Sequence, residues 1–279
     1  MSEEVLGINS IDISDKNYND LAIFLKSLDV DIFALKKSHF LRRIKTRMVR
    51  VGTKTVDEYI KFTRKNIQEQ ENLKQSFSIN VTHFFRNPDS FEELQKRIIP
   101  LITNNNARAK IWSAGCADGA EPYTLAMILD NLGISPAQVK IIASDYNPDS
   151  LALAKRGIYP KDYDKEMPSI YKNKYLTLLE SGEYQVDPKL KNYIEFKIHN
   201  LISDDLHPII GKNTYNLVLC RNVMIYFATE HQNLIYQKFY DALKINGFYM
   251  TGRSEVVLGE FRSKLTVFNA LHRISQKIE

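Results

Sequence analysis

The chain has 279 residues, of which 44% are hydrophobic and 25% are charged, which is typical of a globular protein with one large domain or two smaller ones. It contains no apolar run long enough to span a bilayer, and Met1–Ser10 has neither the basic start nor the apolar core of a signal peptide. The formal net charge of +5 permits an acidic partner but does not require nucleic acid.

The cysteines and histidines give no sign of a metal centre. Cys116 and Cys220 are the only cysteines, they are far apart in the sequence, and the histidines lack the spacing of metal ligands. Such cysteines form neither a zinc site nor a disulfide framework, which is typical of a reducing compartment. We therefore predict a cytoplasmic protein without a metal. From the lack of a membrane-spanning run we predict no membrane insertion, and we expect a monomer.

The first part of the chain is predicted to be helical. Apolar residues recur at helical spacing from Tyr18 to about Asn72, and no convincing strand interrupts them. We therefore predict a small N-terminal helical domain over residues 1–76. The three helices expected in it span Asn19–Leu28, Ile32–Val51 and Thr55–Arg64.

The second of these helices is strongly basic. It contains no acid, and its bases, counted over residues 36–50, are Lys36, Lys37, Arg42, Arg43, Lys45, Arg47 and Arg50. Like charges on a helix repel one another at roughly a few tenths of a kcal/mol per pair, so a stable helix of this kind suggests an acidic partner. The alternative is a solvated face without a partner.

A stretch that mixes polar and aromatic residues joins the helical domain to the rest. Ser76–Arg86 (SFSINVTHFFR) places Asn80, Thr82 and Arg86 around two phenylalanines. A linker whose phenylalanines dock on the second domain would explain the aromatic pair, but it leaves Arg86 without a role. After the linker, the pattern predicts a helix over Ser90–Ile102.

The stretch Lys110–Leu129 (KIWSAGCADGAEPYTLAMIL) has the pattern of a nucleotide-binding βα unit. Residues 111–114 are apolar or small and predict a short buried strand. Gly115 and Gly119 then supply a loop that can turn sharply and let a ligand approach closely, and Pro122 suits the first turn of a helix. The loop alone could also be an ordinary βα turn, because it matches neither the dinucleotide fingerprint nor a P-loop.

The next predicted strand supplies a carboxylate. Val139–Ser144 (VKIIAS) is followed directly by Asp145. A carboxylate at the carboxyl end of the second strand is placed to accept hydrogen bonds from both hydroxyls of a ribose. An adenosine site without a phosphate-binding loop suggests S-adenosylmethionine rather than NAD or ATP.

The remaining elements alternate between helices and strands. We predict a helix at Ser150–Lys155, strands at Tyr193–Lys197 and Asn216–Cys220, a helix at Glu230–Leu243, a turn at Asn246-Gly247, and strands at Phe248–Thr251 and Val267–Ser275. An insertion of about residues 159–192 breaks this alternation and is expected to hold a small antiparallel β element. The alternation predicts an α/β fold over residues 77–279, with a mostly parallel, doubly wound sheet and its ligand at the carboxyl ends of the strands.

Several stretches together resemble the CheR family of chemotaxis receptor methyltransferases. The segments that carry the resemblance are FLRRIKTRM, NVTHFFRNPDSF, IWSAGCADGAEPYTLAM, IIASDYNPDSLALAKRGIY, NLI, LVLCRNVMIYF and GRSE. The match covers about Phe33 to Glu255. It implies a Rossmann-like fold, S-adenosylmethionine as the methyl donor and S-adenosylhomocysteine as the product. The methyl acceptors would be glutamate side chains of chemoreceptor cytoplasmic domains, docked by the basic helix at Lys36–Arg50.

The resemblance also implies roles for single residues. Arg86 and Tyr226 would face the transferring methyl group and are the candidate catalytic residues. The implied cofactor contacts are Asn80, Thr82, Arg86, Glu121, Asp145, Asn200, Leu201, Cys220 and Arg221. The chain departs from the family pattern at Asp118 and Ala120, where the family usually has Thr or Ser and a Glu, and His83 is an unusual choice in its segment.

The implied reaction needs no general base. A glutamate side chain is already ionised at pH 7, because its reference pKa is about 4.3, so the enzyme has to align the oxygen, the methyl group and the sulfur. Arg86 could hold the acceptor carboxylate with two hydrogen bonds, and the Tyr226 ring or hydroxyl could steady the cationic donor.

Other interpretations remain open from the residues alone. The basic helix is compatible with a nucleic-acid methyltransferase, although no Asn/Asp-Pro-Pro-Tyr motif follows the fourth strand, and we expect no nucleic-acid partner. The altered loop at residues 118–120 is compatible with a non-catalytic module that binds the cofactor as a sensor. Tyr226 could be a packed aromatic residue, and Glu121 could serve only the helix dipole.

Overall fold

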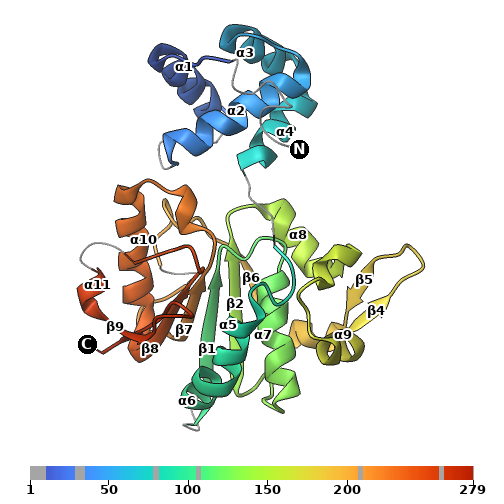
Figure 1. Cartoon of the computed structure of the whole chain (residues 1–279), viewed down its shortest axis with the longest axis vertical. Helices are drawn as coiled ribbons and strands as arrows, with labels where there is room; N and C mark the ends of the chain where they lie inside the picture. The colour runs from blue at the N-terminus through green and yellow to red at the C-terminus, as the bar shows by residue number, and fades with distance from the viewer. Residues whose placement is uncertain are drawn as a thin grey trace. The chain divides into compact units, whose positions relative to one another are not determined.

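The computed structural model describes residues 11–28, 35–77, 82–104, 108–206, 210–257 and 261–278. The chain forms two compact units (Figure 1), which are described separately. One unit comprises Met1–Ile79 together with Tyr226–Ala228, and the other comprises Asn80–Ile225 and Thr229–Glu279.

The helical unit contains four helices in its described part. They are α1 (Asp15–Lys26), α2 (Lys37–Val51), α3 (Val56–Lys65) and α4 (Ile67–Phe77). Local capping explains two of the starts: the Ser14 hydroxyl accepts a hydrogen bond from Asn17 N at 3.2 Å, and Thr55 forms a capping box with Glu58. Helix α4 was not predicted as a separate element.

A buried ion pair links α2, α3 and α4. Arg47 Nε of α2 donates to Glu69 Oε1 of α4 at 3.0 Å, and the Tyr59 hydroxyl of α3 donates to the same oxygen at 2.8 Å. The predicted basic surface of α2 is therefore wrong at Arg47, which is buried inside the unit, and Lys37 is paired with Asp15 of α1. Residues far away in sequence supply the acids that α2 lacks.

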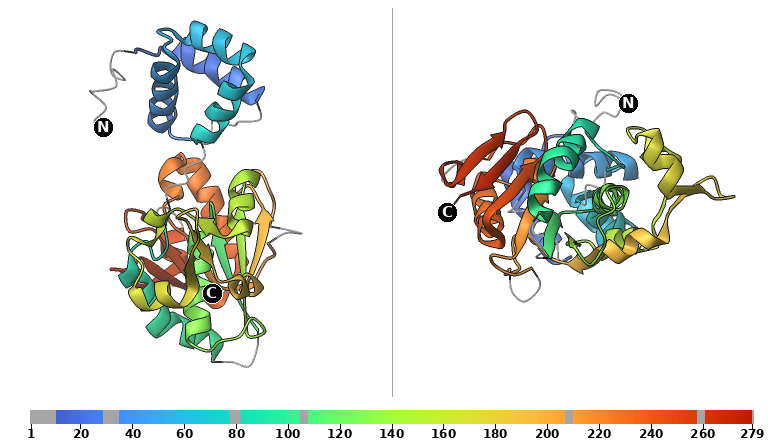
Figure 2. Two further views of the ribbon diagram at one scale, coloured as in Figure 1. Left: turned by 90° about the vertical axis from the view of Figure 1, so that its right-hand side faces the viewer. Right: turned by 90° about the horizontal axis from the view of Figure 1, so that it is seen from below.

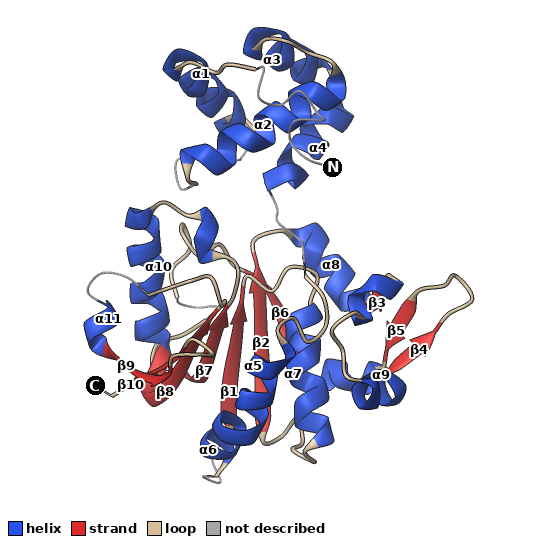
Figure 3. Cartoon of the chain, in the orientation of Figure 1, coloured by secondary structure: helices blue, strands red, loops and turns tan. Residues whose placement is uncertain are grey.

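The second unit is built on a seven-stranded sheet (Figure 3). Its strands stand in the order β6 (Ile194–Ile198), β2 (Val139–Asp145), β1 (Ala109–Ala114), β7 (Tyr215–Cys220), β8 (Leu243–Thr251), β10 (Ile274–Lys277) and β9 (Leu265–Asn269). The first five strands are parallel, which confirms the predicted α/β fold with a mostly parallel sheet. The chain runs from β1 outward to β6 and then returns to β7, so β1 and β7 flank the topological switch point, where ligands bind in such sheets.

Side chains of β1 alternate between two buried layers. Ile111 belongs to a large core cluster that includes residues of the helices α5 (Pro88–Glu93), α6 (Ile99–Thr103) and α7 (Ala120–Asn131). The neighbouring Trp112 ring lies 5.2 Å from the Phe239 ring of α10 (Thr229–Ala242), in the other layer. Because both faces of the sheet are covered, its central strands are apolar throughout.

The insertion forms a separate three-stranded antiparallel sheet. Its strands stand in the order β3 (Ile158–Tyr159), β5 (Tyr184–Val186) and β4 (Leu176–Leu178), with α9 (Ser169–Tyr175) between β3 and β4 in the chain. The insertion lies on the β6 side of the main sheet and β9 on the opposite side (Figure 2). The helix α8 (Pro148–Arg156) leads into it and ends at Gly157, which adopts a left-handed conformation with φ of 71°.

Two predictions about the C-terminal part are wrong. The stretch Val267–Ser275 is an antiparallel pair, β9 and β10, instead of one strand, and the short helix α11 (Phe261–Lys264) precedes it. Asn246-Gly247 lies inside β8 instead of in a turn before it. The pairing of β8 with β7 is interrupted there, and Asn246 adopts the left-handed conformation, with φ of 65°, which asparagine tolerates.

Candidate functional site

The glycine loop between β1 and α7 closes around Asp145. Ala117 N donates to Asp145 Oδ2 at 2.9 Å, and Asn147 N donates to Oδ1 at 3.0 Å. Gly115 and Gly119 have φ of 69° and 92°, so the loop needs residues without a Cβ to make these turns. Asp145 is thus held by backbone N–H groups at the carboxyl end of β2, where the sequence predicted a ribose-binding carboxylate.

The Asp145 carboxylate is suited to a ribose. Each of its oxygens has two lone pairs; Ala117 N and Asn147 N each take one, and the Tyr146 N–H also acts on the carboxylate, so acceptor capacity remains for a hydroxyl donor. Burial raises the pKa of Asp145, while backbone N–H groups of Asn147, Ala117 and Tyr146 act in the opposite direction. A buried acceptor with unused lone pairs is what an adenosyl group requires at this edge of the sheet.

Asp118 is a second buried carboxylate in the same loop. The Tyr163 hydroxyl of the insertion donates to Asp118 Oδ2, and the Tyr159 hydroxyl donates to the Asp118 carbonyl oxygen at 2.6 Å. Burial raises the pKa of Asp118 to about 6, against the hydrogen bond from Tyr163, and the charge of Asp145 adds to the rise. The departure from the family pattern at this position therefore places an unusual titrating group beside Asp145.

We expect Asp118→Asn to make the protein more stable at pH 8 but to change little at pH 4. In the folded protein the pKa of Asp118 lies above the reference value of 3.8. The protonated carboxyl group therefore contributes its full stability to the fold below pH 3.8, and this contribution is lost as the pH rises through about 6. The shift corresponds to about 3 kcal/mol at high pH. Urea unfolding of both proteins from pH 4 to pH 8 measures the difference, and a constant difference across this range would contradict the prediction.

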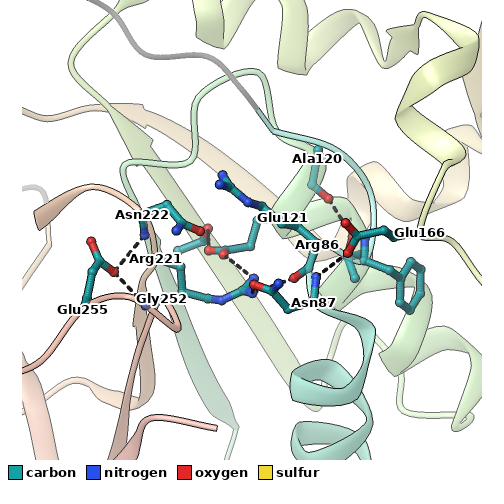
Figure 4. Close-up of polar contacts among 12 residues, drawn as sticks. Arg86, Asn87, Ala120, Glu121, Glu166, Arg221, Asn222, Gly252 and Glu255 are labelled. Carbon is teal, nitrogen blue, oxygen red and sulfur yellow. Dashed lines mark hydrogen bonds and ion pairs between the residues drawn. The ribbon is translucent and has the colours of Figure 1, made fainter. Parts of the chain in front are cut away.

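Arg221 ties the linker to the start of α7 (Figure 4). Its Nη1 donates to Glu121 Oε2 at 3.2 Å, and its Nη2 donates to the carbonyl oxygen of Arg86 at 2.6 Å and to Asn87 Oδ1 at 3.1 Å. The Ser113 hydroxyl at the end of β1 donates to the other oxygen of Glu121 at 2.7 Å. Three of the predicted site residues therefore lie in one partly buried polar network, and Glu121 does more than serve the helix dipole.

Glu255 anchors the loop that follows β7 (Figure 4). Its Oε2 accepts from Asn222 N at 2.8 Å and from Gly252 N at 2.7 Å, while its Oε1 accepts from Val223 N at 2.9 Å and from Ile225 N at 3.3 Å. The sequence analysis did not assign a role to Glu255. The only signal was its place in the GRSE segment, since three of the four amides that it binds, those of Asn222, Val223 and Ile225, lie 30 to 33 residues earlier in the chain.

The turn after β6 holds Asn200 and Leu201. Asn200 Oδ1 accepts from Ile202 N at 2.9 Å, so this amide oxygen shapes its own turn. Lys238 of α10 donates to the carbonyl oxygens of residues 201, 202 and 204 at 2.9, 2.7 and 2.8 Å. Lys238 therefore fixes the backbone on which the predicted adenine contacts lie, and no local sequence pattern indicated this.

The remaining predicted site residues are dispersed. Asn80 lies outside the described residues, Thr82 is half-buried in the linker, and Cys220 is fully buried at the end of β7. Tyr226 belongs to the helical unit, where its carbonyl oxygen accepts from Lys36 N at 2.9 Å and its ring lies 5.4 Å from the His39 ring. Tyr226 is thus packed against α2, and its place beside the methyl group stays a prediction.

Comparison with known proteins agrees with this geometry. Residues 80–273 match the family model of the CheR methyltransferase, SAM binding domain, where SAM is S-adenosylmethionine. A Rossmann-like sheet with a glycine loop and a buried carboxylate at its carboxyl edge, together with this match, defines an S-adenosylmethionine-dependent methyltransferase. S-adenosylmethionine is the cofactor of this enzyme.

Curated relatives give the same result. The chain is 36% identical over 250 residues to a chemotaxis protein methyltransferase of Borreliella burgdorferi, covering 86% of this chain and 87% of the relative. It is 30% identical over 247 residues to one of Listeria monocytogenes, with 88% and 91% covered, and 32% identical over 228 residues to chemotaxis protein methyltransferase 1 of Pseudomonas aeruginosa, with 77% and 80% covered. The chain belongs to the CheR methyltransferase family and acts in chemotaxis.

Membership of this family implies that the protein acts on chemoreceptors. Within the part of the chain that the structure describes, no helix is both long enough and apolar enough to cross a membrane.

Proposed function

We propose that the enzyme transfers a methyl group from S-adenosylmethionine to glutamate side chains of chemoreceptors, with Arg86 at the centre of the site. The observation that carries this proposal is the network of Arg221, which joins the Arg86–Asn87 backbone to Glu121. Glu121 lies in the first turn of α7, the helix that follows the glycine loop, and this loop binds Asp145. One network therefore ties the candidate catalytic residue to the candidate cofactor site.

The roles proposed for the cofactor-binding residues combine this geometry with the family resemblance. We propose that Asp145 accepts from the ribose hydroxyls and that the Glu121 side of the network faces the polar end of the cofactor. The backbone around Cys220 and Arg221 would line the site, Leu201 would lie along the adenine, and the backbone of its turn is held by Lys238. Thr82 and Asn80 would approach from the linker.

In this methyl transfer the protein only has to align the acceptor oxygen with the methyl group and the sulfur. S-adenosylmethionine supplies an electrophilic methyl group on a positively charged sulfur. The acceptor glutamate is ionised at pH 7, so the protein does not have to remove a proton from it. Arg86 would hold one carboxylate in line, since its planar guanidinium can donate two parallel hydrogen bonds. The Tyr226 ring or hydroxyl would face the cationic donor.

We further propose that the exposed bases of α2 dock the receptor. Within residues 36–50, Arg47 is excluded because it is buried against Glu69, while Arg42 and Arg50 are exposed. A basic surface attracts an acidic partner and accelerates its binding at low salt. The helical domain of residues 1–76 would thus select the substrate, and the methyltransferase domain of residues 77–279 would perform the transfer. We propose that the enzyme works as a monomer, which light scattering can test.

We propose that the enzyme is located in the cytoplasm, and the state of its two cysteines supports this location. Both cysteines are free and buried, and burial raises the pKa of Cys116 and of Cys220 well above the ordinary value. Such thiols stay protonated and unreactive, which is compatible with a reducing cytoplasm.

Calorimetry and a transfer assay test the proposed function together. S-adenosylmethionine is titrated into the protein, and labelled methyl transfer is then measured on receptor cytoplasmic fragments, with fragments that carry Gln in place of the accepting Glu as the control. Binding together with base-labile label on the Glu fragments is the expected result. Binding without transfer would instead indicate a sensor module, which the altered loop around Asp118 would then explain.

A further inference from the structure

The turn at His83–Asn87, which carries Arg86, has an unusual backbone. Phe85 and Asn87 adopt left-handed conformations, with φ of 54° and 64°. Asparagine tolerates this region, but a bulky residue such as Phe85 rarely adopts it, and such a conformation persists only where the surrounding structure holds it. The position of the Arg86 side chain therefore depends on whatever holds this turn.

The insertion holds the turn at both ends. Glu166, which lies between β3 and α9, accepts a hydrogen bond from Asn87 N at 2.7 Å through Oε2. Its other oxygen, Oε1, lies 3.0 Å from His83 Nε2. One carboxylate thus bridges the first and last residues of the turn, and Figure 4 shows Glu166 next to Asn87 and Arg86.

The rest of the turn is fixed by backbone and ring contacts. Phe84 N donates to the carbonyl oxygen of Tyr163 at 3.0 Å, and the Phe84 ring lies 4.9 Å from the Tyr159 ring. The Phe85 ring lies 4.6 Å from the Tyr171 ring. Both phenylalanines are therefore packed on residues of the insertion. From the side of the main sheet, the Thr124 hydroxyl accepts from Phe85 N, Arg221 donates to the Arg86 carbonyl oxygen, and the Phe91 ring lies 5.9 Å from the Phe85 ring.

The protonation states of His83 and Glu166 favour their contact at neutral pH. The His83 side chain is 7% exposed, and burial lowers its pKa, so the ring is neutral at pH 7. Burial acts to raise the pKa of Glu166, but the hydrogen bond from Asn87 and the contact with His83 outweigh it, and the pKa lies below its ordinary value. The carboxylate is thus ionised at neutral pH; it accepts a hydrogen bond from Asn87 N at one end of the turn and lies against the His83 ring at the other, without a well-aligned hydrogen bond to that ring.

We infer that Glu166 is a positioning residue for Arg86, and that the antiparallel insertion is for this reason a working part of the methyl-transfer site. This inference rests on the role proposed above for Arg86. Glu166 acts through the backbone of the turn: it keeps Asn87 N and His83 in place, and these fix the direction in which Arg86 leaves the chain.

Single-turnover and steady-state methyl transfer with Glu166→Ala test the inference. Misplacement of an aligning group by about 1 Å can cost up to ~100-fold in rate, so we expect a loss of kcat of between ~10-fold and ~100-fold. The matched control is Asp164→Ala, which removes an ion pair with Lys172 in the same insertion and leaves the hydrogen bonds of the turn described above in place. Thermal unfolding of each variant shows whether the fold is intact.

The double variant with Arg86→Ala separates positioning from a structural role. If Glu166 acts through Arg86, Glu166→Ala lowers the rate by less than about twofold further in the Arg86→Ala background. Glu166→Gln keeps an acceptor for Asn87 N and should restore most of the rate, which also covers the case in which Glu166→Ala fails to fold. A wild-type rate for Glu166→Ala, or a full multiplicative loss in the double variant, overturns the inference.

The experiments distinguish a failure of the proposed function from a failure of the role proposed for Glu166. If the wild-type protein does not methylate receptor fragments, the proposed function is wrong, whatever Glu166 does. If the wild type is active and Arg86→Ala is impaired while Glu166→Ala keeps the full rate, only the positioning role of Glu166 is wrong.

Discussion

Arg86→Ala should lower the rate of methyl transfer to receptor glutamates by about 100-fold or more and leave the protein folded. The fold is spared because the structure uses the backbone of Arg86: its carbonyl oxygen accepts from Arg221, while the neighbouring Asn87 N donates to Glu166. The substitution therefore removes the guanidinium and leaves these two backbone hydrogen bonds in place. Transfer is measured with labelled methyl donor, and folding by thermal unfolding.

Two further variants sharpen this test. Arg86→Lys keeps the charge but cannot donate two parallel hydrogen bonds to one carboxylate, so we expect only partial recovery of the rate. Tyr226→Phe keeps the ring and removes the hydroxyl, which shows whether the hydroxyl contributes. If Arg86→Ala and Tyr226→Phe both transferred methyl groups at the full rate, the catalytic assignments would be wrong.

Glu255→Gln should destabilise the methyltransferase unit by about 4 kcal/mol, because hydrogen bonds to a charged acceptor contribute about 1.5–3 kcal/mol each. Each oxygen of Glu255 accepts two backbone N–H groups. A glutamine would keep one oxygen and turn an NH2 group, itself a donor, toward the other two N–H groups. The isosteric change is therefore harsher here than its small size suggests.

Thermal and urea unfolding measure this loss. For a unit of this size, about 4 kcal/mol corresponds to a fall in Tm of roughly 10 °C. The exposed Glu180→Gln is the matched control and should leave the Tm unchanged. Because Glu255 holds the loop that begins at Arg221, Glu255→Gln should also reduce methyl transfer at temperatures at which the protein is still folded. An unchanged Tm would show that the loop does not need the charge.

The parts of the site that could be predicted are those with a local cause. Gly115, Gly119 and Asp145 follow from the pattern of strand, glycine loop, helix and second strand, and the structure places them together. One interpretation of the linker was that Phe84 and Phe85 dock on the second domain, and both are buried in its core. The glycine loop and Asp145 depend on residues within about one βα unit, so the sequence pattern carries the information. The partners of Phe84 and Phe85 lie far later in the chain, and for these two residues the pattern indicated burial without naming the partners.

The parts that could not be predicted depend on partners far away in the chain. Arg47 looked like a surface base until α4 brought Glu69 against it. The alternation over Val267–Ser275 is the same for one long strand and for the hairpin of β9 and β10, so periodicity alone could not separate them. No sequence pattern in the linker indicated that Glu166 would contact the turn at His83–Asn87.

The sequence by itself determined the class of fold, the cofactor and the family, because the signals for these lie in contiguous segments that repeat a local rule of strand, loop and helix. Only the tertiary structure decided which charged side chains are surface bases and which are internal supports, as with Arg47, Arg221 and Glu255. The reason is physical: a buried charge is stable only with its hydrogen-bonding partners, and folding chooses these partners by proximity in space, which sequence spacing does not encode.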